Sequence, residues 1–164
     1  MVVKTGVVIE HFDPLQTNRL RLEPISAEVA RSIASDDVAG LNAAEGWPQA
    51  GTKNGIALAV EHGHPAGWLV RYCGEVIGDC GIRAPVDHAG CVEIGYGLAV
   101  RYQGRGFGSE VVQAISDWLL AQPGVSTVRG CTLPSNAASR SVLEKAGFTI
   151  VATTEDESVY ERHA

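Results

Sequence analysis

The stretch RYQGRGFGSE, at Arg101–Glu110, combines three glycines with two arginines and leads into an amphipathic segment. Glycines allow the backbone to approach a ligand closely and to adopt unusual dihedral angles. Where a loop enters a helix, successive N–H groups lie beside the positive end of the helix dipole. The stretch therefore predicts a loop that binds a phosphate or pyrophosphate, with a purely structural glycine turn as the alternative.

The segments after the loop alternate helix, strand and helix. Five residues recur at helical spacing, Phe107, Val111, Ile115, Trp118 and Leu119, which predicts a helix that packs one face on a sheet and ends at Pro123–Gly124. VSTVRGCTL is typical of a strand, and SNAASRSVLEKAGF of a second helix with polar and glycine caps. FTIVATTEDESVYERH closes the chain as a pair of strands.

Three consecutive strands precede the loop. AGWLVRYC and EVIGDCGIRA form a hairpin around a Cys-Gly-Glu turn, and GCVEIGYGLAV runs into the loop. Upstream, LQTNRLRLEPIS alternates as a first strand, and Ser26 caps a helix through about Ala34. A short helix follows, then a loop, and GTKNGIALAVEHG predicts a further helix or half-helix. This order predicts an α/β (α+β) fold with a mixed, mostly antiparallel sheet.

Length and composition predict one domain over residues 1–164, with residues 1–14 as an N-terminal extension. The net charge of −6 argues against a nucleic-acid surface. The first residues hold no long apolar run, so we expect neither a signal peptide nor a membrane span, and a cytoplasmic location. The four cysteines are expected to be reduced, buried thiols. His62 and His64 lack a second ligand pair, so we expect no metal.

Two nucleotide motifs are excluded by missing residues. A Walker A loop requires a lysine, and this loop has none. A dinucleotide fingerprint would place Ser109 where a third glycine or alanine belongs and requires an acidic residue after the next strand. The strand VSTVRGCTL carries no acid.

The pattern Gln103-x-x-Gly106-x-Gly108 resembles the acetyl-CoA pyrophosphate loop of the GNAT N-acetyltransferase superfamily. VEIGYGLAV is similar to the strand before that loop, and NAASRSVLEKAGF to a later helix motif of the family. LQTNRLRLEPIS resembles the opening of the RimJ/RimL-like branch, which acetylates ribosomal proteins. The resemblance implies a GNAT fold with six or seven strands and about four helices.

The resemblance also implies where acetyl-CoA binds. The pantetheine arm would run beside the strand before the loop, and the pyrophosphate would meet the N–H groups of the loop. Asn136 and Ser139 would contact the pantetheine and its thiol. The expected cofactor residues are Leu98, Ala99, Val100, Gln103, Gly104, Arg105, Gly106, Phe107, Gly108, Ser109, Asn136 and Ser139.

Acetyl transfer to an amine requires a proton acceptor and a donor for the leaving thiolate. Alternation along the strand places Glu93 on one face with Gly95 and Gly97, so its carboxylate has open space beside it. Glu93 is therefore the expected base, with a solvated strand glutamate as the alternative. Leu143 stands where many family members have an acid tyrosine, which leaves Ser139 as the expected hydroxyl; an ordinary helix serine is the alternative.

The acceptor pocket is expected to include Trp47, Trp68, Tyr72 and Arg83. The sequence thus predicts an acetyl-CoA-dependent N-acetyltransferase acting on a peptide N-terminus or a small-molecule amine. Two alternatives stay open, a non-catalytic acyl-CoA-binding or sensor domain and an enzyme that uses a larger donor such as succinyl-CoA. Exposed strand edges are compatible with a homodimer.

Overall fold

One mixed sheet organises the chain in this computed structural model, which describes residues 7–164. Its eight strands lie in the order β1-β2-β3-β4-β5-β6-β8-β7, and only β5 and β6 are parallel neighbours. The strands are β1 (Leu15–Gln16), β2 (Arg21–Pro24), β3 (Trp68–Tyr72), β4 (Glu75–Ile82), β5 (Cys91–Leu98), β6 (Thr127–Thr132), β7 (Thr149–Thr153) and β8 (Ser158–His163).

The predicted mixed α+β architecture is confirmed, but the sheet has one strand more than expected. The opening segment, predicted as a single strand, is divided by a turn in which the Thr17 N–H donates to the Leu20 carbonyl at 2.9 Å. It therefore folds as the antiparallel pair β1 and β2. The predicted hairpin is also confirmed, since β3 and β4 pair antiparallel. The tight turn between them is formed by Cys73 and Gly74, which both have positive φ angles, of 49° and 83°.

Four α-helices and two short 3-10 helices connect the strands. Ser26 and Asn136 cap their helices as predicted, each accepting a bond from a backbone N–H three residues on. The glycine-rich segment expected as a helix or half-helix is helical over 13 residues. The helices are α1 (Ala27–Ala34), α2 (Ala50–His62), α3 (Phe107–Leu120) and α4 (Ala137–Lys145), with η1 (Ala39–Leu41) and η2 (Val100–Tyr102).

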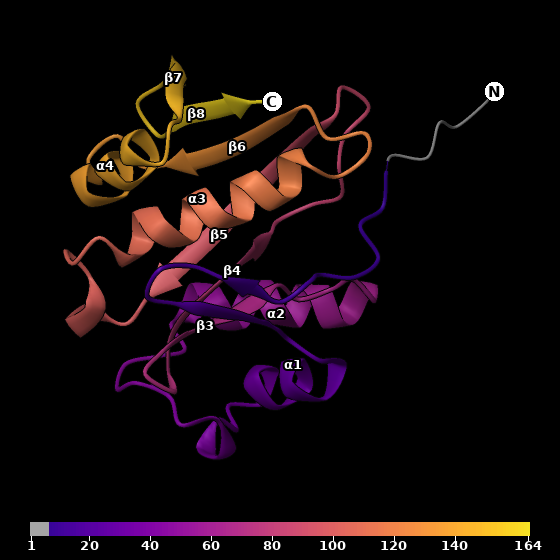
Figure 1. Cartoon of the computed structure of the whole chain (residues 1–164), viewed down its shortest axis with the longest axis vertical. Coiled ribbons are helices and arrows are strands. Elements are labelled where there is room, and N and C mark those ends of the chain that lie inside the picture. Colours follow the sequence, from indigo (N-terminus) through magenta and orange to yellow (C-terminus); the bar gives the residue numbers. More distant parts are fainter. Residues whose placement is uncertain (1–6) are drawn as a thin grey trace.

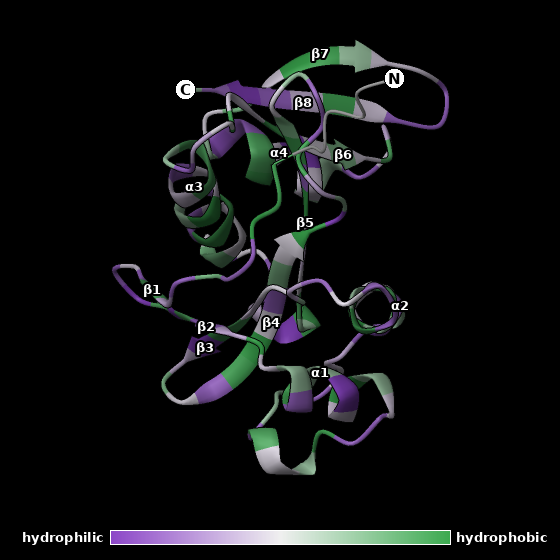
Figure 2. Ribbon diagram, turned by 90° about the vertical axis from the view of Figure 1, so that its right-hand side faces the viewer, coloured by the Kyte–Doolittle hydropathy of each residue, from purple (hydrophilic) through white to green (hydrophobic). Residues whose placement is uncertain are grey.

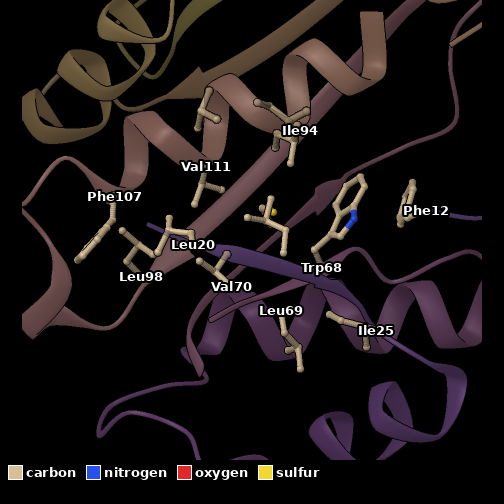
Figure 3. Packing of buried hydrophobic residues seen from close by; sticks show 14 of the residues in the cluster. Phe12, Leu20, Ile25, Trp68, Leu69, Val70, Ile94, Leu98, Phe107 and Val111 are labelled. Atoms are coloured by element: carbon tan, nitrogen blue, oxygen red, sulfur yellow. The ribbon is translucent and has the colours of Figure 1, made fainter. Parts of the chain in front are cut away.

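Helices lie on both faces of the sheet (Figure 2). Figure 2 shows α3 and α2 on opposite sides of β4 and β5. In Figure 1, α4 lies beside β6 at the end of α3, while α1 lies near α2. The predicted inward face of α3 is confirmed for Phe107, Val111, Ile115 and Leu119, each at most 1% exposed, whereas Trp118 is only partly buried. Figure 3 shows Phe107 and Val111 of this helix among the buried side chains.

The predicted N-terminal extension contributes to the core where the structure describes it. Phe12 is buried and stacks on Trp68, with ring centroids 4.1 Å apart (Figure 3). Asp13 accepts bonds from Trp68 Nε1 at its backbone carbonyl and from Trp118 Nε1 at its carboxylate. Residues 1–6 of the extension lie outside the described residues.

The cysteines are all free thiols, but the expectation that they are buried holds only for Cys80, because Cys91 and Cys131 are half-buried and Cys73 is exposed. Cys73 is exposed because it occupies the tight turn between β3 and β4 rather than a strand. Among residues 7–164, no helix has the length and apolar character needed to cross a membrane.

Candidate active site

The strands β5 and β6 separate toward their carboxyl ends. Their parallel ladder runs from Cys91 and Thr127 to Ile94 and Gly130, whereas β5 continues to Leu98. The Ala99 N–H donates to the Ile77 carbonyl on β4, so the neighbouring peptide groups of β5 alternate between β4 and β6. The peptide groups of residues 96 and 98 therefore point toward β6 where the ladder has ended. An extended ligand can bind there as an additional strand.

Part of this strand edge is already bonded within the protein. The Leu98 carbonyl accepts bonds from Gln103 Nε2 at 3.0 Å and from Gln49 Nε2 at 3.2 Å. Gln103 thus fastens the start of the glycine loop to the end of β5. A ligand at this edge would use the Leu98 N–H rather than its carbonyl.

The glycine loop ends at the N-terminus of α3, as predicted. Gly104 and Gly106 have φ angles of 71° and 82°, a region that favours glycine. The N–H of Glu110 donates to the Gly106 carbonyl at 3.2 Å. The N–H groups that precede it in the helix, at residues 107–109, have no intrahelical acceptor. They form the first turn of a 14-residue helix and are available to bind an anion.

Arg19, in the turn between β1 and β2, fixes the loop from outside. Its backbone N–H donates to Glu110 Oε1 at 2.9 Å, its Nε to Glu110 Oε2 at 2.8 Å, and a terminal nitrogen to the Arg105 carbonyl at 3.1 Å. Thr17 also donates to Glu110. Burial raises the pKa of Glu110, but the bonds from Thr17 and Arg19 outweigh this effect and lower it. The opening sequence motif thus holds the anion loop in place.

Arg105 lies over an aromatic cluster. Its guanidinium carbon is 5.1 Å from the ring centroid of Phe107, 5.3 Å from that of Tyr102 and 5.7 Å from that of Tyr72. Tyr72 is expected to line the acceptor pocket, but the structure places it beside Arg105 and Phe107 at the glycine loop. Cation–π contacts with these rings hold the positive charge of Arg105 at the entrance of the glycine loop.

Gly108 has a packing role in addition to its place in the loop. A Cβ at this position would lie 3.1 Å from Val142 Cγ2 of α4. The missing side chain therefore permits the close contact of α3 with α4. This contact brings the N-terminal half of α4 toward the open end of β5.

Ser139 of α4 contacts β5 through a tyrosine that the sequence did not single out. The Tyr96 and Ser139 hydroxyl oxygens are 2.9 Å apart, and either one can be the donor. Burial raises the pKa of Tyr96, with the bond to Ser139 opposing the rise. Leu143, at the position where the resemblance implies a tyrosine in other family members, is 1% exposed and packs against Gly130.

A cavity of about 690 Å³ lies on the other face of β5, between α2 and the sheet. Its floor includes Gly95 and Gly97, so the predicted side-chain-free face is confirmed. Its residues are Val8, Ile9, Gln49, Gly51, Thr52, Asn54, Gly55, Ile56, Leu58, Ala59, His62, His64, Pro65, Ala66, Asp79, Cys80, Gly81, Ile82, Arg83, Ala84, Pro85, Gly95, Tyr96 and Gly97. The glycine face leaves room for a ligand against β5.

Only some of the predicted base and acceptor residues lie at this cavity. Glu93 lies on the same face as Gly95, next along the strand beyond the cavity lining, and its carboxylate is 3.8 Å from Arg83 Nε. Arg83 itself lines the cavity. Trp68 has no exposed surface and faces Phe12 on the opposite side of the sheet, so it offers no contact for an acceptor.

Trp47 is 5% exposed and supports a carboxylate that the sequence analysis missed. Its Nε1 donates to Asp79 Oδ1 at 2.8 Å, and Thr52 Oγ1 donates to the same oxygen at 2.6 Å. Asp79 lies opposite Gly97 in the ladder and lines the cavity. The sequence does contain a signal for Asp79, because this acidic residue stands inside the mostly apolar strand EVIGDCGI. Charged groups are rarely buried without a partner, so an acid at such a position indicates a partner or a ligand.

A comparison with family models gives a match to the acetyltransferase (GNAT) domain over residues 19–149. The chain belongs to the GNAT family of acetyltransferases. Among residues 7–164 of this GNAT protein, no group of three or more His, Cys, Asp or Glu side chains is placed to hold a metal ion.

Relatives of this GNAT chain agree with the assignment. It is 32% identical over 80 residues to the uncharacterised N-acetyltransferase p20 of Bacillus licheniformis, covering 49% of this chain and 45% of that protein. The match thus spans about half the length of that relative. The uncharacterised N-acetyltransferase YoaA of Bacillus subtilis is 28% identical over 155 residues, covering 84% of this chain and 83% of that protein.

The solved structures show the same fold. RimL, a ribosomal L7/L12 α-N-protein acetyltransferase in complex with coenzyme A, superposes with a TM-score of 0.67 at 19% identity. The superposition covers 92% of this chain and 98% of RimL.

Proposed function

We propose that the protein transfers an acetyl group from acetyl-CoA to a primary amine, by direct attack in a ternary complex. One observation carries the proposal: the open edge of β5 leads directly into the unpaired N–H groups at the start of α3. A pantetheine arm fits the first feature, and a pyrophosphate fits the second. The RimL structure, of the same fold, was determined with coenzyme A bound.

The glycine face of β5 supplies the place for the acceptor. A neutral amine nitrogen attacks the thioester carbon, a C–N bond forms and the C–S bond breaks. The nitrogen loses a proton, which Glu93 accepts directly or through water, and the CoA thiolate gains one. The hydroxyl pair of Ser139 and Tyr96 is suited to supply that proton, because it lies at the open end of β5.

The acceptor is a primary amine, either a protein N-terminus or a small molecule. The acetyltransferases that share the fold include RimL, which acts on ribosomal L7/L12, and the aminoglycoside acetyltransferase AAC(6')-Ib. The cavity of about 690 Å³ has room for either a peptide end or a small amine. The protein is proposed to act in the cytoplasm.

The test is release of CoA thiol from acetyl-CoA with and without a panel of amines, followed by mass spectrometry of the amine. We expect thiol release that depends on the amine, with a mass increase of one acetyl group on it. CoA binding without acetylation of any amine would favour a non-catalytic acyl-CoA sensor. Faster reaction with succinyl-CoA would favour the larger donor.

A further inference from the structure

Asp79 is the one acidic residue among the described residues that line the cavity. Its Oδ1 already accepts two bonds, from Trp47 Nε1 and Thr52 Oγ1. Its Oδ2 forms no hydrogen bond or ion pair within residues 7–164, yet it is not sealed from solvent. The carboxylate is therefore held in one orientation by one oxygen, while the other oxygen is available to a ligand.

The charge of Asp79 is unfavourable without such a ligand. Burial raises the pKa of this carboxyl, and the bonds from Thr52 and Trp47 only partly oppose the rise. A carboxylate that is largely removed from water costs free energy unless a cation neutralises it. The cavity thus favours a ligand that brings a positive charge to this position.

Asp79 also lies close to the expected site of reaction. It is the ladder partner of Gly97, which is two residues from Gly95 on the same strand face, about 7 Å along β5. Glu93 is a further two residues away and is paired with Arg83 instead. The two carboxylates therefore have separate roles, with Glu93 beside a cationic side chain and Asp79 without one.

We propose that Asp79 is a specificity-determining residue, whose Oδ2 binds an ammonium group of a cationic acceptor. This ammonium group is not the reacting nitrogen, which must be neutral to attack the thioester. Trp47 and Thr52 orient the carboxylate, and α2 closes the cavity around the ligand. Selection of a cationic amine rests on the proposed function, but binding of the ammonium group does not require turnover.

The test compares binding of benzylammonium with binding of its neutral isostere, benzyl alcohol, to the full chain at moderate salt. The wild-type protein is expected to bind benzylammonium about tenfold more tightly, since a charge-assisted bond contributes about 1.5 kcal/mol. Asp79→Asn should abolish that preference while leaving affinity for benzyl alcohol unchanged. Glu61→Gln, which removes an equal charge from the exposed surface of α2, should retain it.

Amide chemical shifts in the wild-type protein provide a readout that needs no variant. Benzylammonium should shift the resonances of Thr52, Asp79 and Gly97. Equal affinity for the two probes, shifts confined to other residues, or an unchanged preference in Asp79→Asn would each overturn the proposal. A separate titration with CoA tests the proposed function, so loss of CoA binding with retained ammonium binding would refute that function alone.

Discussion

The hydroxyl oxygens of Tyr96 and Ser139 lie 2.9 Å apart and join the open end of β5 to the first turn of α4. The separation of β5 from β6 begins two residues before Tyr96. A thiol that arrives along the β5 edge would therefore meet this hydroxyl pair. The pair is the arrangement on which the proton donor in the proposed mechanism depends.

Ser139→Ala should lower kcat about 100-fold, the usual range for loss of a positioned proton donor, while the Kd for CoA changes little. Tyr96→Phe should cause a smaller loss, because Ser139 keeps its hydroxyl. Steady-state kinetics and a CoA titration measure the two effects. An unchanged kcat in Ser139→Ala would show that this hydroxyl is an ordinary helix serine.

Glu93→Gln should lower kcat about 100-fold without changing the Kd for CoA, because the variant cannot accept the amine proton. A matched control is Glu155→Gln, at an exposed position in the turn between β7 and β8. Equal rates for wild type and Glu93→Gln across the pH range would assign Glu93 a surface role.

Arg19→Ala should raise the Kd for CoA about tenfold, since it removes the bonds that hold Glu110 and the Arg105 carbonyl. Arg21→Ala removes an exposed arginine two residues along the same segment and serves as the control. Calorimetric titration with CoA measures both. If the two variants bind CoA equally well, the anchoring role of Arg19 is wrong.

Gly108→Ala should destabilise the fold by about 1 kcal/mol, because its Cβ would press on Val142. Truncation of the neighbour, in the double variant Gly108→Ala/Val142→Ala, should recover part of that loss. Chemical denaturation of the single and double variants measures the coupling. Strict additivity would mean that Gly108 is not required for the contact between α3 and α4.

Asp79→Asn should unfold at a temperature equal to or above that of the wild type at pH 8. The raised pKa of Asp79 means that the folded state binds its proton more tightly than the unfolded state. The contribution of Asp79 to stability is thus present at low pH and is lost as pH rises through the raised pKa. Any stability advantage of Asp79→Asn over the wild type should therefore disappear toward pH 4. A variant less stable than the wild type at pH 8 and more stable at pH 4 would show that the contribution of Asp79 to stability increases with pH, which is the opposite of this prediction.

Local patterns were sufficient to predict the parts of the site that lie close together in the sequence. The glycine loop, the cap at Asn136 and the shared face of Glu93, Gly95 and Gly97 depend on spacing within single elements, and the structure confirms their geometry. The boundary between β1 and β2 has no such local signal, because the turn between them contains neither glycine nor proline, and the segment was predicted as one strand.

Contacts between segments that are distant in the sequence could not be predicted from patterns within single elements. Trp68 was expected at the acceptor pocket, but Phe12, 56 residues earlier by number, covers it on the other face of the sheet. Asp79 takes its partners from the start of α2 and the loop before it, and Arg19 reaches a glutamate in α3. Such partners follow from sheet order and helix placement, which alternation and capping patterns do not determine.

A structure of the protein with CoA bound would show whether the glycine loop and the open edge of β5 form the cofactor site. We expect pyrophosphate oxygens within hydrogen-bonding distance of the N–H groups at residues 106–109, with the pantetheine along the open edge of β5. The thiol should then lie near Ser139 and Tyr96. CoA bound elsewhere, or a pantetheine that does not follow β5, would refute this assignment of the cofactor site.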